Sequence, residues 1–208
     1  VPVYWRTGDA AFYDSKPDAR ISRRDQPKTL QMEVFVYGVT CLLPISEYTR
    51  ETIGGLTRVD NLFDPFMPLV DAREWLLSLT GKEGDERFGH SARAIKKLLM
   101  RQEEDTVVRR QGQVKLKIPA FGTIIPLEQL SDGYQSTVAL TTDIMSVALE
   151  TFKTAENAEG IVLLDEIDVH LHPTWKMEII NGLRAVFPRM QFLITTHDPL
   201  CLLGTRPG

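Results

Sequence analysis

The sequence has very little cysteine, no long apolar run and almost no net charge. Its two cysteines, Cys41 and Cys201, stand among apolar residues, which is typical of buried reduced thiols in a reducing cytosol. No apolar run approaches the roughly 18 residues of a membrane span, and the first residues do not have the regions of a secretion signal. The net charge of −4 excludes a chain that attracts nucleic acid by its overall charge. We therefore expect a cytoplasmic protein without a membrane partner.

The composition is that of a folded chain. Its 208 residues are enough for one substantial domain, and 43% hydrophobic with 25% charged residues lies far from the signature of disorder. The chain begins at Val1 without methionine, in what looks like the middle of an element. We expect it to be a piece of a longer polypeptide.

Helical and strand patterns alternate in the second half of the sequence. We predict strands at 30–43 (ending near Gly38), 115–121, 123–130, 161–165 and 190–197, helices at 68–79, 91–104, 131–152 and 173–187, and a loop at 81–89. The strand at 161–165 is an apolar run that ends in an acid, which is typical of a parallel strand buried on both faces, and the strand at 190–197 is another buried strand that ends in polar residues. The pattern predicts an α/β unit with its functional groups at the carboxyl ends of the strands.

Two adjacent carboxylates, Asp165 and Glu166, end the strand at 161–165. Mg²⁺ prefers oxygen ligands and keeps several waters, so Asp165 can hold it directly or through water. Glu166, on the other side, can polarise an attacking water. A strand whose end is acidic without any function is the alternative that this pattern leaves open.

Two further segments carry candidate phosphate-binding groups. In LSDGYQS, at the start of the helix at 131–152, Ser131 offers a hydroxyl and Gly133 lets the backbone approach an anion at the helix end. A plain capping turn has the same sequence. His197, at the end of the last strand, can hydrogen-bond a terminal phosphate or fix a water, although a structural histidine is the alternative.

The order of these segments resembles ABC-type ATPases. LSDGYQS resembles the ABC signature motif, IVLLDE resembles Walker B with its catalytic glutamate, IDVHLHP resembles the D-loop region and TTHD resembles the H-loop. Over roughly Leu127 to Leu203 the sequence is similar to the AAA-family, OLD-like and SMC-like branch found in bacterial antiphage systems such as Septu and the PtuA-like ATPases of retrons.

The resemblance implies an α/β fold, namely the C-terminal lobe of an ABC-type ATPase head with a parallel sheet flanked by helices. It implies a strand and loop region at 1–57, a helical insert at 58–112 and the lobe with the four motifs at 113–208. It also implies a homodimer or higher oligomer that sandwiches ATP, and a partner nuclease that the head controls.

The resemblance also assigns roles, with ATP and Mg²⁺ as cofactors. Asp165 would coordinate Mg²⁺, Glu166 would activate water and His197 would sense the γ-phosphate. The nucleotide held by a second copy would be met by residues of the signature and the D-loop: Ser131, Gly133, Gln135 and Asp168.

The phosphate-binding loop of a complete ATPase head is missing from this sequence. No G-x-x-x-x-G-K-[ST] segment occurs, and the only Gly-Lys pair, Gly81 and Lys82, is followed by Glu83. We expect this chain alone to bind ATP poorly, with Walker A supplied by the rest of a longer polypeptide or by a second chain.

Other functions remain open from the residues alone. A metal-dependent nuclease would use Asp165, Glu166 and Asp168 as ligands. His170 and His172 with Asp168 make an incomplete zinc set, and we favour a role for them in shaping the turn before Pro173. A non-hydrolysing assembly module and an SMC-like DNA-repair or DNA-sensing ATPase are further alternatives.

A group of basic residues favours a contact with the phosphates of DNA or RNA. A solvated helix face is the alternative interpretation. The group is Arg93, Lys96, Lys97, Arg101, Arg109 and Arg110.

Overall fold

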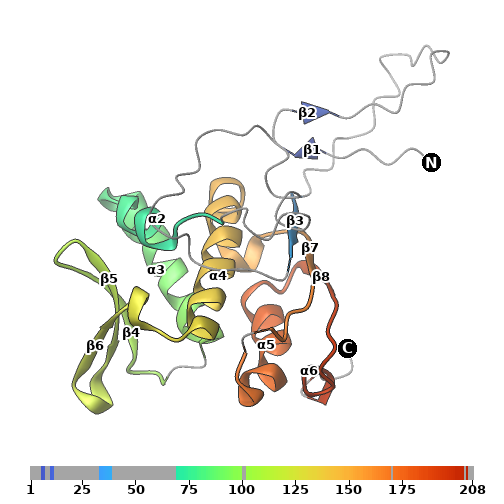
Figure 1. Cartoon of the computed structure of the whole chain (residues 1–208). Coiled ribbons are helices and arrows are strands. Elements are labelled where there is room, and N and C mark those ends of the chain that lie inside the picture. The colour runs from blue at the N-terminus through green and yellow to red at the C-terminus, as the bar shows by residue number, and fades with distance from the viewer. Residues whose placement is uncertain are drawn as a thin grey trace, which may run out of the picture.

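The computed structural model describes residues 6–7, 10–11, 33–38, 69–99, 102–169, 171–203 and 205. The elements, shown in Figure 1, are β1 (Arg6–Thr7), β2 (Ala10–Ala11), β3 (Glu33–Tyr37), α2 (Ala72–Ser78), α3 (Gly81–Leu98), β4 (Thr106–Arg110), β5 (Gln113–Ile118), η1 (Pro119–Phe121), β6 (Thr123–Pro126), η2 (Leu127–Gln129), α4 (Asp132–Thr151), η3 (Ala155–Asn157), β7 (Gly160–Leu164), α5 (Pro173–Val186), β8 (Met190–Ile194) and α6 (Leu200–Leu203). The predicted α/β fold is confirmed.

A parallel sheet in the order β3-β7-β8 positions the candidate site. Tyr37 pairs with Leu164, and Leu164 pairs with Ile194, so the three strands end at the same level. β3 and β7 approach closely at Gly160, where a Cβ atom would lie 2.4 Å from the Glu33 carbonyl oxygen. The carboxyl ends of these strands therefore form one edge, as the alternating pattern predicts.

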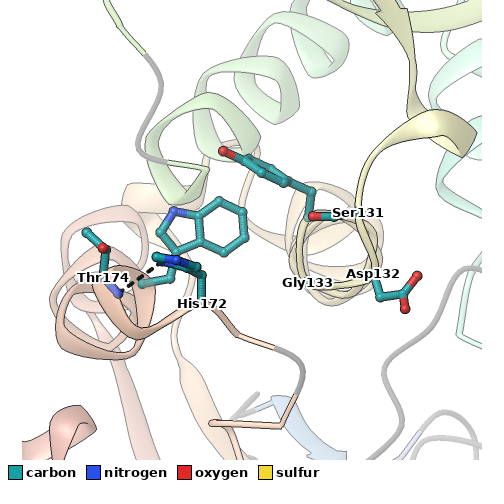
Figure 2. Close-up of a pocket in the computed structure, with 7 residues that line it drawn as sticks. Ser131, Asp132, Gly133, His172 and Thr174 are labelled. Carbon is teal, nitrogen blue, oxygen red and sulfur yellow. Dashed lines mark hydrogen bonds between the residues drawn. The ribbon is translucent and has the colours of Figure 1, made fainter.

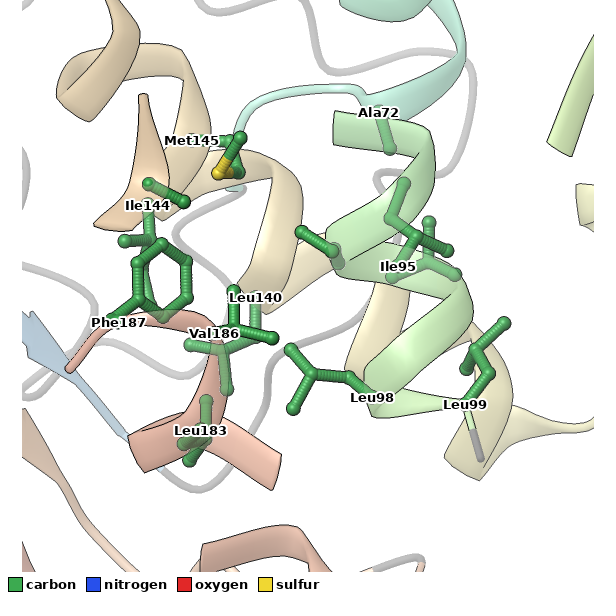
Figure 3. Packing of buried hydrophobic residues seen from close by; sticks show 14 of the residues in the cluster. Ala72, Ile95, Leu98, Leu99, Leu140, Ile144, Met145, Leu183, Val186 and Phe187 are labelled. Atoms are coloured by element: carbon green, nitrogen blue, oxygen red, sulfur yellow. The ribbon is translucent and has the colours of Figure 1, made fainter. Parts of the chain in front are cut away.

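Helix α4 is the centre of the core. Its residues from Thr137 to Leu149 are all buried, so it is covered on every side rather than amphipathic. Figure 3 shows apolar side chains of α3 and of the α5 end meeting α4, among them Leu98, Leu140 and Leu183.

A buried carboxylate ties α4 to two other segments. Asp143 is 2% exposed and accepts hydrogen bonds from the Tyr37 hydroxyl at 2.8 Å and from the Val70 amide at 3.0 Å. These bonds satisfy a group that would otherwise be costly to bury, and they fix β3 and the start of α2 against α4.

An antiparallel sheet, β4-β5-β6, contacts the outer helices α2 and α3. Figure 1 shows it on the far side of α3 and α4 from the parallel sheet. Arg109 of β4 joins it to α3, because its guanidinium lies over the Phe88 ring at 4.2 Å and pairs with Asp85. Strand β4 was not predicted from the sequence.

The predicted loop at 81–89 is wrong, because this segment forms the first half of α3. Its glycines suggest a loop, yet Gly84 packs so tightly on the preceding turn that a Cβ atom would lie 2.6 Å from the Leu79 carbonyl carbon. An i,i+4 ion pair between Glu83 and Arg87, 2.7 Å apart, also favours the helix. The helix ends at Leu98 rather than at 104.

The predictions for 30–43 and for the cysteines are tested in part. β3 ends at Tyr37, as predicted, and Cys201 is a buried free thiol. Cys41 and most of the region 1–57 lie outside the described residues. None of the helices that the structure describes is both long and apolar enough to cross a bilayer.

Candidate functional site

The site is built where β7 and β8 end. The ladder of the sheet continues one residue beyond the strands, because the Asp165 amide donates to the Tyr37 carbonyl at 3.0 Å and the Thr195 amide donates to the Leu164 carbonyl at 2.9 Å. Asp165 and Thr195 are therefore held side by side by backbone bonds.

Thr195 also joins the two carboxylate residues through its side chain. Its Oγ1 donates to Asp165 Oδ1 at 2.5 Å and accepts from the Glu166 amide at 2.8 Å. Glu166 has a φ of 50°, a left-handed conformation that is uncommon for a residue with a side chain. The turn after β7 is thus strained at Glu166 and is anchored to the neighbouring strand end.

Glu166 and His197 face each other across this edge of the sheet. Glu166 Oε1 lies 3.4 Å from His197 Nε2, and the side chains are 35% and 86% exposed. The structure therefore brings together the two residues that were predicted to be catalytic, and leaves both accessible to a ligand.

Asp168 is bound to the segment that carries His197. Its Oδ1 accepts from Thr196 Oγ1 at 2.5 Å and from the His197 amide at 3.3 Å. Burial opposes ionisation of Asp168, but these hydrogen bonds and the charge of Lys176 hold its pKa below the usual value. Asp168 thus fixes the His197 backbone within its own chain.

An ion pair holds the next residue of this segment to α5. Lys176 Nζ lies 2.8 Å from Asp198 Oδ2, with side chains 18% and 25% exposed. The hydrogen bond from Lys176 holds the pKa of Asp198 below its usual value, and the same bond raises the pKa of Lys176. Burial raises the pKa of the Cys201 thiol in the following helix α6. This thiol is neutral at physiological pH, which fits a structural role.

The segment LSDGYQS, which resembles a signature motif, leads into α4. Ser131 is the N-cap residue, its backbone oxygen accepts from the Gln135 amide at 2.9 Å, and its exposed hydroxyl makes no capping bond to α4. Gly133 is buried. The Gln135 amide group donates to the carbonyls of Leu130, at 2.7 Å, and Glu128, at 3.2 Å, so it holds the turn before the helix.

A pocket of about 500 Å³ lies between this segment and the start of α5 (Figure 2). Tyr134 and Trp175 meet edge to face in its wall, with ring centroids 3.9 Å apart. His172 is the N-cap of α5 and accepts from the Thr174 amide at 3.4 Å, which confirms its predicted role in the turn before Pro173. The pocket is lined by Ser131, Asp132, Gly133, Tyr134, His172, Thr174 and Trp175.

The site residues thus fall into two groups. Asp165, Glu166, Asp168 and His197 gather at the strand ends, whereas Ser131 and Gly133 line the pocket, which includes none of those four.

Most of the predicted basic group is engaged within the chain. Lys96 donates to the Glu103 carbonyl and Lys97 to the Ala185 carbonyl, each at 2.9 Å. Arg93 contacts the His90 ring nitrogen at 3.0 Å, and Arg109 joins β4 to α3. Arg101 lies outside the described residues. The contacts of Arg93, Lys96 and Lys97 lie at the surface, and Arg110 is exposed, so a contact with DNA or RNA stays a prediction.

Comparison with known proteins identifies the family. Residues 49–202 match the model described as "AAA domain, putative AbiEii toxin, Type IV TA system". The chain belongs to this AAA-domain family. It is 44% identical over 172 residues to the "Septu protein PtuA" of Bacillus mycoides (strain KBAB4), a match that covers 83% of this chain and 23% of that protein.

Two further similarities accompany this one. The AAA-domain chain is 31% identical over 150 residues to the "Retron Vc95 probable ATPase" of Vibrio cholerae serotype O1 biovar El Tor, covering 64% of the chain and 29% of that protein. The SMC head domain from Thermotoga maritima aligns with 63% of the chain and 43% of its own, at 17% identity and a TM-score of 0.42. The chain spans about a quarter of the length of the two curated relatives.

The donor atoms of this AAA-domain chain fit a magnesium ion at Asp165. The residue offers hard carboxylate oxygen beside Glu166, and Mg²⁺ is commonly bound by one or two carboxylates together with substrate phosphates. Within the described residues, no three His, Cys, Asp or Glu side chains are grouped to hold a metal ion by themselves. His170, a member of the predicted zinc set, lies outside these residues.

Sequence reasoning missed Thr195, Thr196 and Lys176. The two threonines stand directly before His197 in TTHD, so their position next to a candidate residue was a signal. Their partners depend on how β8 lies beside β7, which no local pattern contains. Lys176 faces Asp198 from a different element, α5.

Proposed function

We propose that this AAA-domain chain supplies the hydrolytic groups of an ATPase that converts ATP and water to ADP and phosphate. The observation that carries the proposal is the pair of Glu166 and His197, 3.4 Å apart at neighbouring strand ends, with Asp165 beside them. A carboxylate within reach of a water and a histidine within reach of a phosphate are the groups that this hydrolysis needs.

Each residue has a distinct task. Asp165 holds Mg²⁺, which, when bound, offsets the negative charge of the phosphates. Glu166 accepts a proton from the water that attacks the γ-phosphorus. His197 donates a hydrogen bond from Nε2 to a γ-phosphate oxygen, and Asp168 keeps its backbone in place.

The signature residues act on the nucleotide of a second copy. Ser131 and Gly133, with Gln135 bracing the turn, meet the γ-phosphate held by a partner head, so that two heads enclose ATP. The exposed Ser131 hydroxyl and the pocket next to it support this division. We propose a homodimer or a higher oligomer on this basis.

The similarity to the Septu and retron proteins supports a proposed wider role. ATP hydrolysis by the head controls an associated nuclease in cytoplasmic antiphage defence, and Walker A comes from outside this sequence. The regions 1–57, 58–112 and 113–208 then serve as the strand and loop part, the insert and the lobe with the four motifs. DNA or RNA is a further partner to test.

A metal-dependent nuclease is the second candidate. It requires Asp165, Glu166 and Asp168 to share metal ions, but Asp165 binds Thr195 whereas Asp168 binds Thr196 and the His197 amide. The carboxylates are thus tied to different neighbours, which favours the ATPase. Cleavage of DNA or RNA without any nucleotide would support the nuclease instead.

The substitution Glu166→Gln tests the proposal in the intact natural protein. It keeps the size of the side chain but removes the base, so ATP turnover falls by about 100-fold or more. Glu178→Gln, at an exposed position of α5, is the matched control and keeps wild-type turnover. Steady-state phosphate release measures both, and unchanged turnover in Glu166→Gln would refute the assignment.

A further inference from the structure

We propose that Thr195 is the positioning residue of this site, because one hydroxyl fixes both the Asp165 carboxylate and the turn that presents Glu166. The inference rests on the proposed function, in which Asp165 and Glu166 act on magnesium and water. Thr195 stands in the TTHD segment that resembles the H-loop, but the resemblance assigns no role to it.

The hydrogen bonds of Thr195 require a hydroxyl. Oγ1 donates its only proton to Asp165 Oδ1 and accepts the Glu166 amide proton on a lone pair. Serine can make both bonds, and valine, which has the same shape, can make neither. Substitution by valine therefore removes both hydrogen bonds while the packing of the side chain is kept.

The backbone places this hydroxyl firmly. The Thr195 amide donates to the Leu164 carbonyl at 2.9 Å, and the Thr195 carbonyl accepts from the Ile167 amide at 3.2 Å. The residue is thereby bonded on both sides of the Asp165–Glu166 turn. Because threonine is branched at Cβ, few side-chain rotamers are open to it.

The turn needs such an anchor. Glu166 has a φ of 50°, which is unfavourable for a residue with a Cβ atom and persists only where the surroundings hold it. The bond from its amide to Thr195 is one of these restraints, and this conformation accompanies the approach of the Glu166 carboxylate to His197 at 3.4 Å.

Thr195 also orients the carboxylate of Asp165. Oδ1 of Asp165 accepts the hydrogen bond from Thr195, and among the described residues no hydrogen bond is made to Oδ2. The carboxylate then meets a magnesium ion in one orientation. Residues that orient metal ligands in this way affect metal affinity and turnover together.

The next residue shows that the arrangement is selective. Thr196 follows in the chain, but its hydroxyl donates to Asp168 Oδ1. The two adjacent threonines thus donate to two different carboxylates, and of the two it is Thr195 that hydrogen-bonds to the Asp165–Glu166 turn.

Three variants of the intact natural protein test the inference. In Thr195→Val, kcat for ATP falls about 10- to 100-fold and the Mg²⁺ concentration for half-maximal turnover rises by a similar factor, while KM for ATP changes little. Thr195→Ser restores both. Thr123→Val, at an exposed threonine of β6 whose hydroxyl donates to the nearby Phe121 carbonyl, leaves both unchanged.

Two readouts do not depend on turnover. Hydrogen exchange of the peptide covering residues 165–168 becomes faster in Thr195→Val and not in Thr195→Ser, because the Glu166 amide loses its acceptor. Binding of Mn²⁺, measured by electron paramagnetic resonance in the presence of ATP, weakens in the valine variant by about the same factor as for Mg²⁺. Unfolding temperatures check that all variants are folded.

The outcomes separate this inference from the proposed function. Wild-type kcat and Mg²⁺ dependence in Thr195→Val would overturn the role of Thr195 and leave the ATPase proposal standing. A loss that serine fails to restore would also overturn it. If the wild-type protein hydrolyses no ATP, the proposed function fails, and Mn²⁺ binding together with hydrogen exchange still decides on Thr195.

Discussion

Glu166 combines a functional carboxylate with a backbone conformation that most residues avoid. Its φ of 50° is held by neighbouring strand ends and brings the side chain to His197. Strain of this kind costs of order 1–3 kcal/mol and is found most often at functional sites. The location of the strain therefore agrees with the proposed role of Glu166 as the base.

The ion pair of Lys176 and Asp198 gives a pH dependence at the residue scale. The pKa of Asp198 is lowered in the folded chain, so its contribution to stability is present above its ordinary value of 3.8 and is lost as the pH falls through the folded pKa. The pKa of Lys176 is raised, so its contribution is lost only as the pH rises past 10.5 and through the folded pKa. Asp198→Asn lowers the unfolding temperature at pH 7 but not well below pH 3.8.

The matched control is another ion pair. Glu159 and Arg189 are 2.8 Å apart but more than half exposed, so Glu159→Gln leaves the unfolding temperature nearly unchanged at both pH values. Thermal unfolding of the intact natural protein at pH 7 and at acid pH measures both variants. An equal effect of Asp198→Asn at both pH values would contradict the assigned pKa.

At the residue scale, the sequence predicted the acidic residues and the histidine of the candidate site, but not the side chains that hydrogen-bond to them. Asp165, Glu166 and His197 follow apolar strands directly, and parallel strands end at one edge, so their meeting was predictable. The links from Thr195 and Thr196 to particular carboxylates depend on the register of β8 beside β7. A single sequence does not contain that register.

Among the elements, the pairing of β3 with β7 depends on a glycine. Gly160→Ala places a Cβ atom 2.4 Å from the Glu33 carbonyl oxygen, and the overpacking lowers local stability by about 1–3 kcal/mol. Hydrogen exchange of the β3 and β7 amides in the intact natural protein measures the effect.

A helix glycine provides the control for this substitution. At Gly89 of α3 the nearest atom to an added Cβ is the flexible Arg93 guanidinium nitrogen at 3.6 Å, so Gly89→Ala stabilises α3 by about 0.5–1 kcal/mol. If Gly160→Ala left the exchange of β3 and β7 unchanged, the close approach of the two strands would be wrong.

Elements with a clear period were predicted well, and those with conflicting signals were not. The strands β7 and β8 and the helices α4 and α5 lie where their apolar patterns place them. The prediction that β8 is buried is wrong, because its residues alternate in exposure and Leu193 is 50% exposed. At 81–89 the glycines outweighed the helical pattern, although tertiary packing of Gly84 and Phe88 holds a helix there. β4 was missed because its arginines suggested a charged surface, whereas Arg109 is used to join β4 to α3.

For the whole molecule, the candidate site residues occupy two places. Glu166 and His197 lie at the strand ends, and Ser131 and Gly133 line the pocket between α4 and α5. In the proposed assembly, one head cleaves ATP with its own Glu166 while a partner head supplies Ser131.

The central claim is tested most directly by combining two inactive variants of the intact natural protein. Glu166→Gln removes the base, and Ser131→Arg blocks the signature segment, so each variant alone loses ATP turnover. Produced together, they form mixed assemblies in which one site has a normal base and a normal partner serine.

Each variant produced with a second, differently tagged copy of itself serves as the control, and phosphate release by the purified mixed assembly is the measurement. The proposal predicts turnover in the mixed assembly that neither variant shows alone. Turnover that stays absent in the mixed assembly, while the wild-type protein is active, would contradict it.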